Sequence, residues 1–234
     1  MNTTSDALTQ LATTHTPDEI AFVKRLLDAM FETHNTPRAE VMALTSMQAV
    51  RLHKAAAAAR ASGVGGSGED GEQTQGAAGG SLTMAQAERV LAGLVEEGWL
   101  EKSRAGYLGL SPRALMELRG WLVETYNEPP PAEGEEDDED GAVKTRVKMC
   151  HACREIVTAG QRCARRECLG RLHDACVQTF FRSQRERRCP LCKAEWTGRD
   201  FVGERAARGA DKGRGSTGAA ARRSAVSVED EEDE

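Results

Sequence analysis

The chain has 234 residues, of which 4% are aromatic and 29% are charged, and its formal net charge is −6. So few aromatic residues exclude a single large hydrophobic core, and no run of about 18 apolar residues is present to span a membrane. The first 20 residues lack the cationic segment and apolar core of a secretory signal, so we expect a protein that is not exported.

Charge and glycine are unevenly distributed along the chain. Residues 133–140 read EGEEDDED and the last seven read VEDEEDE, whereas residues 142–200 carry 14 Lys and Arg against 6 Asp and Glu, a formal charge of +8. Glycine-rich and acidic stretches cannot bury a core. We therefore expect two folded units, 16–127 and 145–197, with disorder at 1–15, in the insertion 61–80, in the linker 128–144 and in the tail 198–234.

The first predicted helix begins after Thr16, because Thr16 and Glu19 form a capping box with Pro17 in the first turn. Apolar residues then recur at helical spacing, at Ile20, Val23, Leu27, Met30 and Phe31. A second helix is predicted from Thr36, with the alanine-rich segment 54–60 extending it. Its inward residues would be Val41, Leu44, Met47 and Val50 or Leu52.

A third helix is predicted to open with the capping box Thr83–Gln86 and to stop at Gly98. Its apolar face comprises Met84, Ala87, Val90, Leu91, Leu94 and Val95. Residues 99–102 and 107–110 flank a short turn and predict a hairpin. A fourth helix starts at Ser111 and carries Leu115, Leu118, Trp121 or Leu122, and Tyr126. Three helices followed by a hairpin is the order of a winged helix.

Winged helices often bind DNA through the third helix. Here that helix offers Arg89 but also Glu88, Glu96 and Glu97, and residues 82–127 carry five basic against six acidic side chains. Phosphate binding needs several Lys or Arg on one face. The charge pattern therefore favours a protein-docking module and leaves DNA binding as the alternative.

All seven cysteines and one of the five histidines lie between residues 150 and 192. Eight such ligands are the number that two tetrahedral Zn²⁺ ions need. Disulfides would require an oxidising compartment and would leave one thiol over, and no βαβ pattern supports a redox site. The spacing is best explained as a cross-brace. The first ion would bind Cys150, Cys153, His173 and Cys176, and the second Cys163, Cys168, Cys189 and Cys192.

No open coordination position remains in such a cross-brace, so both ions are predicted to be structural. The small apolar centre of the finger would come from Leu172, Val177, Phe180 and Phe181. Residues 176–181 are predicted to form a short helix after the sixth ligand.

The ligand order of four Cys, one His and three Cys is used by variant RING fingers and by plant homeodomain fingers. The latter usually place a Trp two residues before the seventh ligand, where this chain has Arg187. The ending CPLC at 189–192, followed by Trp196, looks like a RING finger. The stretches TPDEIAFVKRLLDAM, TMAQAERVLAGLVEEGWLEK, LSPRALMELRGWLVETY and CLGRLHDACVQTFF resemble the non-structural maintenance of chromosomes element 1 family, over about residues 7–53 and 82–197.

The expected fold is therefore mainly α with small β hairpins: a winged-helix domain followed by a variant RING finger, with disordered linkers and a C-terminal tail. The resemblance implies a nuclear RING-type ubiquitin ligase subunit of the structural maintenance of chromosomes 5/6 complex, acting in DNA repair by recombination. It also implies a MAGE-type winged-helix subunit and a kleisin subunit as partners. The resemblance also implies an earlier winged helix in the family, and we expect residues 16–127 to correspond to the second one.

A RING finger holds a ubiquitin-charged conjugating enzyme in an attack-ready pose, so catalysis is by orientation and no residue is catalytic. Ala152 stands where RING ligases often place a bulky aliphatic residue, so we expect weak activity without a partner. The candidates for contact with the conjugating enzyme are His151, Ala152, Pro190, Leu191 and Lys193.

Two alternatives remain open for the finger. It could be a non-catalytic scaffold of the same complex, or it could contact DNA without sequence preference through its basic side chains. The arginines of that patch are Arg162, Arg165, Arg166, Arg171, Arg182, Arg185, Arg187 and Arg188.

Overall fold

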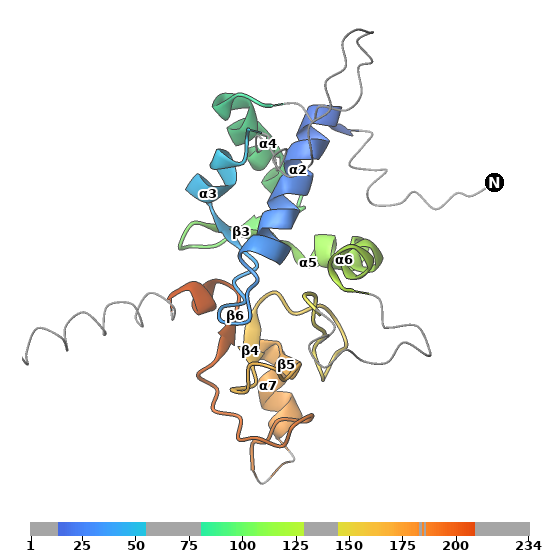
Figure 1. The fold of residues 1–234 in the computed structure, drawn as a ribbon, viewed down its shortest axis with the longest axis vertical. Helices are drawn as coiled ribbons and strands as arrows, with labels where there is room; N and C mark the ends of the chain where they lie inside the picture. The colour runs from blue at the N-terminus through green and yellow to red at the C-terminus, as the bar shows by residue number, and fades with distance from the viewer. Residues whose placement is uncertain (1–13, 55–80, 129–144, 183, 185, 209–234) are drawn as a thin grey trace, which may run out of the picture.

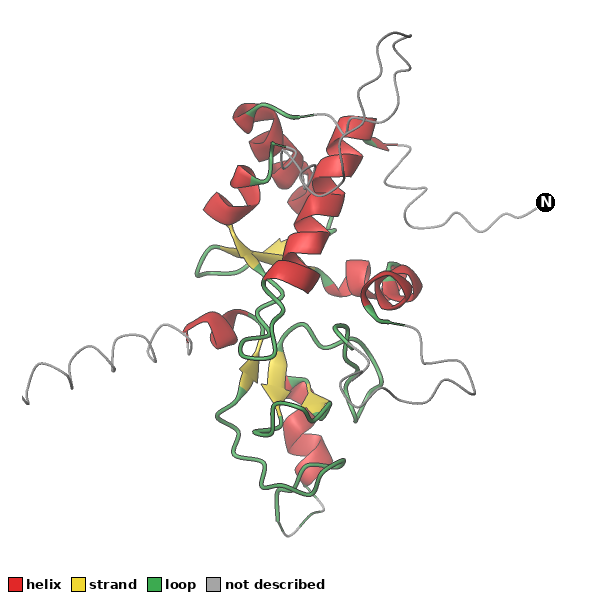
Figure 2. Cartoon of the chain, in the orientation of Figure 1, coloured by secondary structure: helices red, strands yellow, loops and turns green. Residues whose placement is uncertain are grey.

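The computed structural model describes residues 14–54, 81–128, 145–182, 184 and 186–208. These residues form two units, the upper and lower halves of Figure 1, and helices dominate the upper one (Figure 2). The predicted extension 55–60, the insertion 61–80, nearly all of the linker and the end of the tail lie outside the described residues. Among the described helices, none is both long and apolar enough to cross a membrane.

The first helix begins where the sequence predicts. Helix α2 (Pro17–Asp28) has the complete Thr16–Glu19 capping box, and it continues as the π-helical turn η1 (Ala29–Thr33). Of the predicted face, Ile20 and Val23 are only partly buried. The side chains that reach the core are Phe22, Leu26, Leu27, Met30 and Phe31.

The helix predicted from Thr36 does not form. Thr36 and Ala39 instead exchange backbone hydrogen bonds of 3.2 and 3.1 Å, and Asn35 bridges to Glu40, which closes a turn. The chain then enters strand β1 (Leu44–Thr45) and helix α3 (Ser46–Arg51).

The second helix starts later because a competing signal in the sequence is stronger. Thr45 and Gln48 form a complete capping box, whereas the segment after Thr36 closes into a turn. With this later start, Met47 faces solvent and is 66% exposed, so the prediction that it points inward was wrong. Leu44 is fully buried, as expected.

The third helix and the hairpin follow the prediction. Helix α4 (Met84–Glu96) carries the Thr83–Gln86 capping box, and Gly98 after it adopts φ +77°. The prediction that Met84 belongs to the apolar face was wrong, because Met84 lies in the first turn of the helix and is 55% exposed. Strands β2 (Leu100–Lys102) and β3 (Tyr107–Leu110) form the hairpin.

Strand β1 joins this hairpin in an antiparallel sheet of order β1-β3-β2, with Leu44 opposite Leu108 and Leu100 opposite Leu110. Helix, strand, helix, helix and hairpin is the order of a winged helix. We call the described residues between 14 and 128 the winged-helix unit.

The predicted fourth helix is two helices. Helix α5 (Pro112–Glu117), capped by Ser111, ends at Leu118, whose φ of −90° and ψ of 2° interrupt the helical backbone. Helix α6 (Arg119–Tyr126) then buries Leu122 and leaves Trp121 half-buried. The Tyr126 hydroxyl donates to Asp28 at 2.8 Å, which ties α6 to α2.

The second unit, which we call the finger, comprises the described residues from 145 to 208. Strands β4 (Gly160–Arg162), β5 (Arg171–Leu172) and β6 (Phe201–Val202) form an antiparallel sheet of order β5-β4-β6. Helix α7 (Asp174–Phe181) begins two residues before the predicted 176–181.

The predicted onset of disorder at residue 198 is wrong for residues 198–208. Strand β6 pairs with β4, with Val202 opposite Gly160, so the fold continues past 197. Leu172, Val177 and Phe181 are buried, as predicted, and Phe180 is partly buried.

The winged-helix unit and the finger contact each other through the loop after η1. In Figure 1 this loop runs down from the upper half to β4 and β6. Within it, the Asn35 side chain donates to the Arg146 carbonyl at 2.9 Å, and the Gly203 amide donates to the Glu40 carbonyl at 2.7 Å. On the other side, the Asn127 side chain accepts from the amides of Arg146 and Val147. These bonds fix the finger against the winged-helix unit.

Candidate metal centres

The eight predicted ligands meet in two groups. Within each group the ligand atoms all lie within 4.8 Å of one another. We call the first group, Cys150, Cys153, His173 and Cys176, the histidine-containing cluster. We call the second group, Cys163, Cys168, Cys189 and Cys192, the all-cysteine cluster. These are the two ligand sets of the predicted cross-brace.

Both Cys-x2-Cys pairs fold into the same tight turn. The Arg154 amide donates to the Cys150 carbonyl at 2.9 Å, and the Lys193 amide donates to the Cys189 carbonyl at 3.1 Å. Arg154 and Lys193 both adopt a left-handed backbone, with φ of 65° and 60°. Each turn thus brings the two sulfurs of its pair to one side, as a metal requires.

His173 is prepared to bind through Nδ1. Its Nε2 lies 2.9 Å from the Ile156 carbonyl, which can only accept, so Nε2 carries the proton. This leaves the other ring nitrogen, Nδ1, facing the cluster, 3.3 Å from the sulfur of Cys153. A carbonyl that orients a histidine in this way is typical of metal sites.

The sulfur positions of the all-cysteine cluster fit a zinc ion. The sulfurs of Cys163 and Cys192 lie 3.4 Å apart, and those of Cys168 and Cys189 lie 3.6 Å apart. A tetrahedral ion with Zn–S bonds of about 2.3 Å separates its sulfurs by about 3.8 Å. Gly170 lines this cluster, and a Cβ built on it would lie 2.7 Å from the Cys189 sulfur.

The thiols are poorly arranged to ionise together without a cation. Burial raises the pKa of Cys163 and of Cys176 to about 12, and the neighbouring thiols add to this rise. Burial opposes ionisation of Cys150 as well, but the amides of Cys153, His173 and Ala152 outweigh it and lower its pKa to about 6. A divalent ion removes this conflict because it lets all the ligands of a site deprotonate. Two structural zinc ions therefore fit this donor set.

The predicted contact residues flank these clusters. Leu191 is 50% exposed between two ligands, and Ala152 and Lys193 are exposed. His151 and Pro190 are partly buried, and the Lys193 ammonium donates to the Pro190 carbonyl at 3.0 Å. These positions make the residues accessible, and their contact with a conjugating enzyme stays a prediction.

Glu40 is a buried charged residue that the sequence did not reveal. Its carboxylate is buried between the two units, 2.8 Å and 2.5 Å from the Nε and Nη2 atoms of Arg171 and 2.6 Å from Lys148. Arg162 lies 3.4 Å away. The only signal in the sequence is an acidic residue inside a stretch predicted to be an apolar helix.

The cations around Glu40 keep it ionised. Burial alone would raise the pKa of Glu40, but the hydrogen bonds and charges of Arg171 and Lys148 outweigh burial and lower it from 4.5 to about 2. Because the pKa of Glu40 is lower in the folded state than in the unfolded state, ionised Glu40 stabilises the fold. This contribution is fully present above about pH 4.5 and is lost as the pH falls towards 2.

This ion cluster also bears on the DNA-binding alternative. Arg162 and Arg171 are 6% and 0% exposed, so these two arginines face inward and cannot reach phosphate. Arg185 lies outside the described residues. The exposed members of the predicted patch are Arg165, Arg166, Arg182, Arg187 and Arg188.

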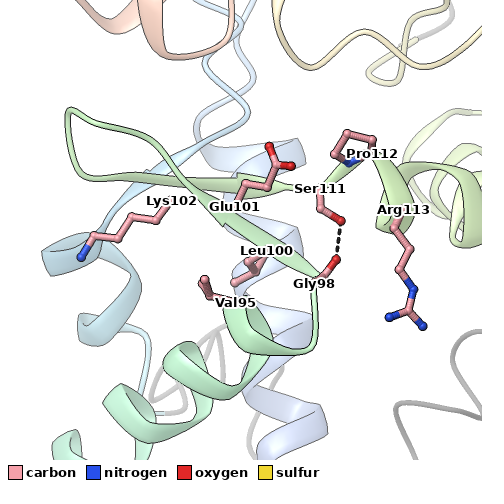
Figure 3. A pocket seen from close by; sticks show the side chains of 8 residues that line it. All are labelled: Val95, Gly98, Leu100, Glu101, Lys102, Ser111, Pro112 and Arg113. Atoms are coloured by element: carbon pink, nitrogen blue, oxygen red, sulfur yellow. Dashed lines mark hydrogen bonds between the residues drawn. The ribbon is translucent and has the colours of Figure 1, made fainter.

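A pocket of about 510 Å³ lies beside the hairpin of the winged-helix unit (Figure 3). The Ser111 hydroxyl donates to the Gly98 carbonyl at 2.5 Å, and Arg113 pairs with Glu117 at 2.7 Å. Figure 3 shows Glu101 and Lys102 pointing in different directions. The pocket therefore gathers no cluster of reactive groups. It is lined by Val95, Gly98, Leu100, Glu101, Lys102, Ser111, Pro112 and Arg113.

Comparisons with known proteins agree with this architecture. A family model described as "Nse1 non-SMC component of SMC5-6 complex" matches residues 1–118, and one described as "RING-like domain" matches residues 150–192. The curated non-structural maintenance of chromosomes element 1 homologs of Homo sapiens and Bos taurus are each 32% identical over 111 residues. The match covers 47% of this chain and 34% of each relative, so it spans about a third of their length.

Among solved structures, a chain of an "Nse1-Nse3-Nse4 complex" superposes with a TM-score of 0.53 at 19% sequence identity. The match covers 82% of this chain and 62% of that chain. At this identity the likeness concerns the fold alone.

Proposed function

Because this chain belongs to the Nse1 family, the non-SMC component of the SMC5-6 complex, we propose that it is a RING-type ubiquitin ligase subunit of that complex. In this proposal it acts in the nucleus, in DNA repair by recombination. The observation that carries the ligase assignment is a finger that matches a RING-like domain and leaves Leu191, an apolar knuckle residue, 50% exposed. An exposed apolar side chain held between two metal ligands offers a rigid contact for a partner protein.

The proposed mechanism is orientation. Both metal centres have four protein ligands, so bound zinc would supply rigidity and no reactive water. The chain's own part is to hold Leu191, Pro190 and Ala152 as a fixed docking surface for a ubiquitin-charged conjugating enzyme. Lys193, which follows the last zinc ligand of the second knuckle, would add a cation that hydrogen-bonds both ubiquitin and the conjugating enzyme. Fixing the thioester in an attack-ready pose accelerates transfer without an acid, a base or a nucleophile from the finger.

The proposed partners are a MAGE-type winged-helix subunit, Nse3, and a kleisin subunit, Nse4. The solved complex whose chain has a similar fold is named for Nse1, Nse3 and Nse4. Helix α4 carries Glu88 and Glu96, and this acidic charge favours docking of a protein over binding of DNA. We expect weak ligase activity from the chain alone, because the first knuckle presents only Ala152 where a bulky contact is usual.

Discharge of ubiquitin from a charged conjugating enzyme tests this function. We expect the zinc-loaded chain to accelerate discharge when the MAGE-type subunit is added, and Leu191→Ala to slow that discharge roughly tenfold, the effect of losing about 1.4 kcal/mol of contact energy. Zinc content should be unchanged, because the Leu191 side chain is half exposed and is not a ligand.

Met47→Ala is the matched control, because Met47 is similarly exposed, at 66%, but lies on the winged-helix unit. Its discharge rate should match that of the unsubstituted chain. No discharge with any partner and any conjugating enzyme would exclude a ligase.

That negative outcome would favour the second candidate, a non-catalytic scaffold. The buried contact between Glu40 and Arg171 supports it, because this contact seats the finger rigidly on the winged-helix unit whether or not a conjugating enzyme binds.

A further inference from the structure

Arg171 joins the winged-helix unit to the all-cysteine cluster. Its Nε and Nη2 atoms bind the Glu40 carboxylate, and its Nη1 atom donates to the carbonyls of Cys168 and Gly170, both at 2.7 Å. The side chain is fully buried. The guanidinium therefore spans from a carboxylate of one unit to a metal-ligand loop of the other.

The carbonyls that Arg171 holds belong to the backbone that shapes the cluster. The Gly170 amide lies 3.4 Å from the Cys168 sulfur and donates to it, and the Gly170 carbonyl also accepts from the Cys163 amide at 3.0 Å. The loop 168–170 thus carries one ligand and braces a second. Two of its three carbonyls accept hydrogen bonds from Arg171.

We propose that Glu40 is a positioning residue of the all-cysteine cluster: by anchoring Arg171, it holds loop 168–170 in the geometry that binds zinc. The winged-helix unit thereby contributes to the metal affinity of the finger, although the carboxylate binds no metal itself. Partners of this kind, one step removed from the ligands, typically change metal affinity by about 10- to 100-fold. The inference concerns metal binding and is independent of the ligase proposal.

Loss of the Glu40 carboxylate would change zinc affinity in opposite directions through its charge and through its positioning of Arg171, so the direction of the change distinguishes the two effects. One carboxylate faces three cations, a net charge of +2 on these four groups, and four thiolates with one Zn²⁺ would carry −2. Removing the Glu40 charge makes the field near the cluster more positive, which on its own favours the anionic zinc–thiolate centre. Loss of positioning would weaken zinc binding, because the carboxylate that orients Arg171 is gone.

The experiment is ¹¹³Cd NMR on the full chain loaded with ¹¹³Cd²⁺, with stepwise addition of a chelator. A site with four sulfurs and a site with three sulfurs and one nitrogen give separate resonances, so the affinity of each cluster is followed in one sample. For Glu40→Gln we expect the resonance of the all-cysteine cluster to be lost at a chelator concentration about 10- to 100-fold lower than in the unsubstituted chain. The chelator concentration at which the resonance of the histidine-containing cluster is lost should change by a much smaller factor.

Asn35→Ala is the control, because it removes a hydrogen bond to Arg146 between the same two units without touching Arg171. With this substitution, the chelator concentration at which the resonance of the all-cysteine cluster is lost should stay within about twofold of that for the unsubstituted chain, since no bond to loop 168–170 is lost. The proposal is overturned if Glu40→Gln tightens that site or leaves it unchanged, if both clusters weaken equally, or if Asn35→Ala has the same effect. If Glu40→Gln does not fold, Glu40→Asp replaces it, because Asp keeps the charge but is shorter by one methylene. The same chelator titration of Glu40→Asp then supports or overturns the proposal by the same criteria.

Discussion

Zinc removal by a chelator such as EDTA is expected to unfold the finger while the winged-helix unit stays folded. The apparent free energy of zinc binding to small structural sites is about 10–16 kcal/mol per site. A whole domain is usually stable by only about 5–15 kcal/mol. The finger has a small apolar core, so we expect that its fold cannot survive the loss of two such sites. Its buried apolar side chains, apart from the cysteines, are Val147, Ile156, Val157, Leu172, Val177, Phe181, Trp196 and Val202. The winged-helix unit buries many apolar side chains of its own, Phe22 among them, and contains no residue of either metal cluster.

Hydrogen exchange read by mass spectrometry measures this difference. Amides of β4, β5 and α7 should lose protection in chelator, while those of α2 and α4 keep it. Trp196 gives a second signal, because it is 4% exposed, its ring lies 5.7 Å from that of Phe181, and it donates to Gln161 at 2.9 Å. Its fluorescence should shift to the red on chelation, and Trp196→Phe should abolish the shift. Retained protection in α7 after complete zinc removal would show that the finger does not depend on metal.

Gly170→Ala is expected to remove one of the two zinc ions. The added Cβ would lie 2.7 Å from the Cys189 sulfur and 3.5 Å from the Cys168 sulfur, and the first distance leaves no room for a sulfur in its ligand position. The Cys189 sulfur sits on a knuckle closed by its own hydrogen bond, so it cannot move aside without opening that turn. By elemental analysis we expect about one zinc ion per chain in place of two, with the histidine-containing cluster retaining its ion.

Gly120→Ala is the matched control for this substitution. Gly120 lies within α6, and a Cβ there would have no neighbour within 4 Å. The change should leave both zinc ions in place and stabilise the helix by about 0.5–1 kcal/mol. If Gly170→Ala also retains two zinc ions, the all-cysteine cluster does not have the geometry described above.

The helix starts and the metal ligands could be predicted from the sequence. The capping boxes at Thr16 and Thr83 place α2 and α4 correctly, because a cap is decided by residues three positions apart. The number and spacing of the cysteines with His173 indicated two zinc sites, and the cross-brace pattern assigned the ligands to them as the structure groups them.

The Thr45–Gln48 capping box was a local signal that the helix predicted from Thr36 overlooked. The other features that the sequence did not show depend on contacts between distant residues. The turn after Thr36 reads as a helix start, yet it serves to place Glu40 against Arg171, which lies 131 positions later. Phe201 and Val202 lie in a polar stretch that indicates disorder, and only their pairing with β4 makes them a strand. The burial of the Arg162 side chain could not be predicted either. An arginine-rich segment suggests a solvated surface, and nothing near Arg162 in the sequence indicates its buried partner, Glu40.

Native mass spectrometry of the purified, reduced chain tests the central claim most directly, because it counts the metal ions that each folded chain carries. We expect a single dominant species with two zinc ions, and the charge-state distribution of a folded finger should disappear only when both ions are stripped. A purified chain whose dominant folded species, before any metal is stripped, carries one zinc ion or none would contradict it. A mass lowered by disulfide formation among the seven cysteines would do the same.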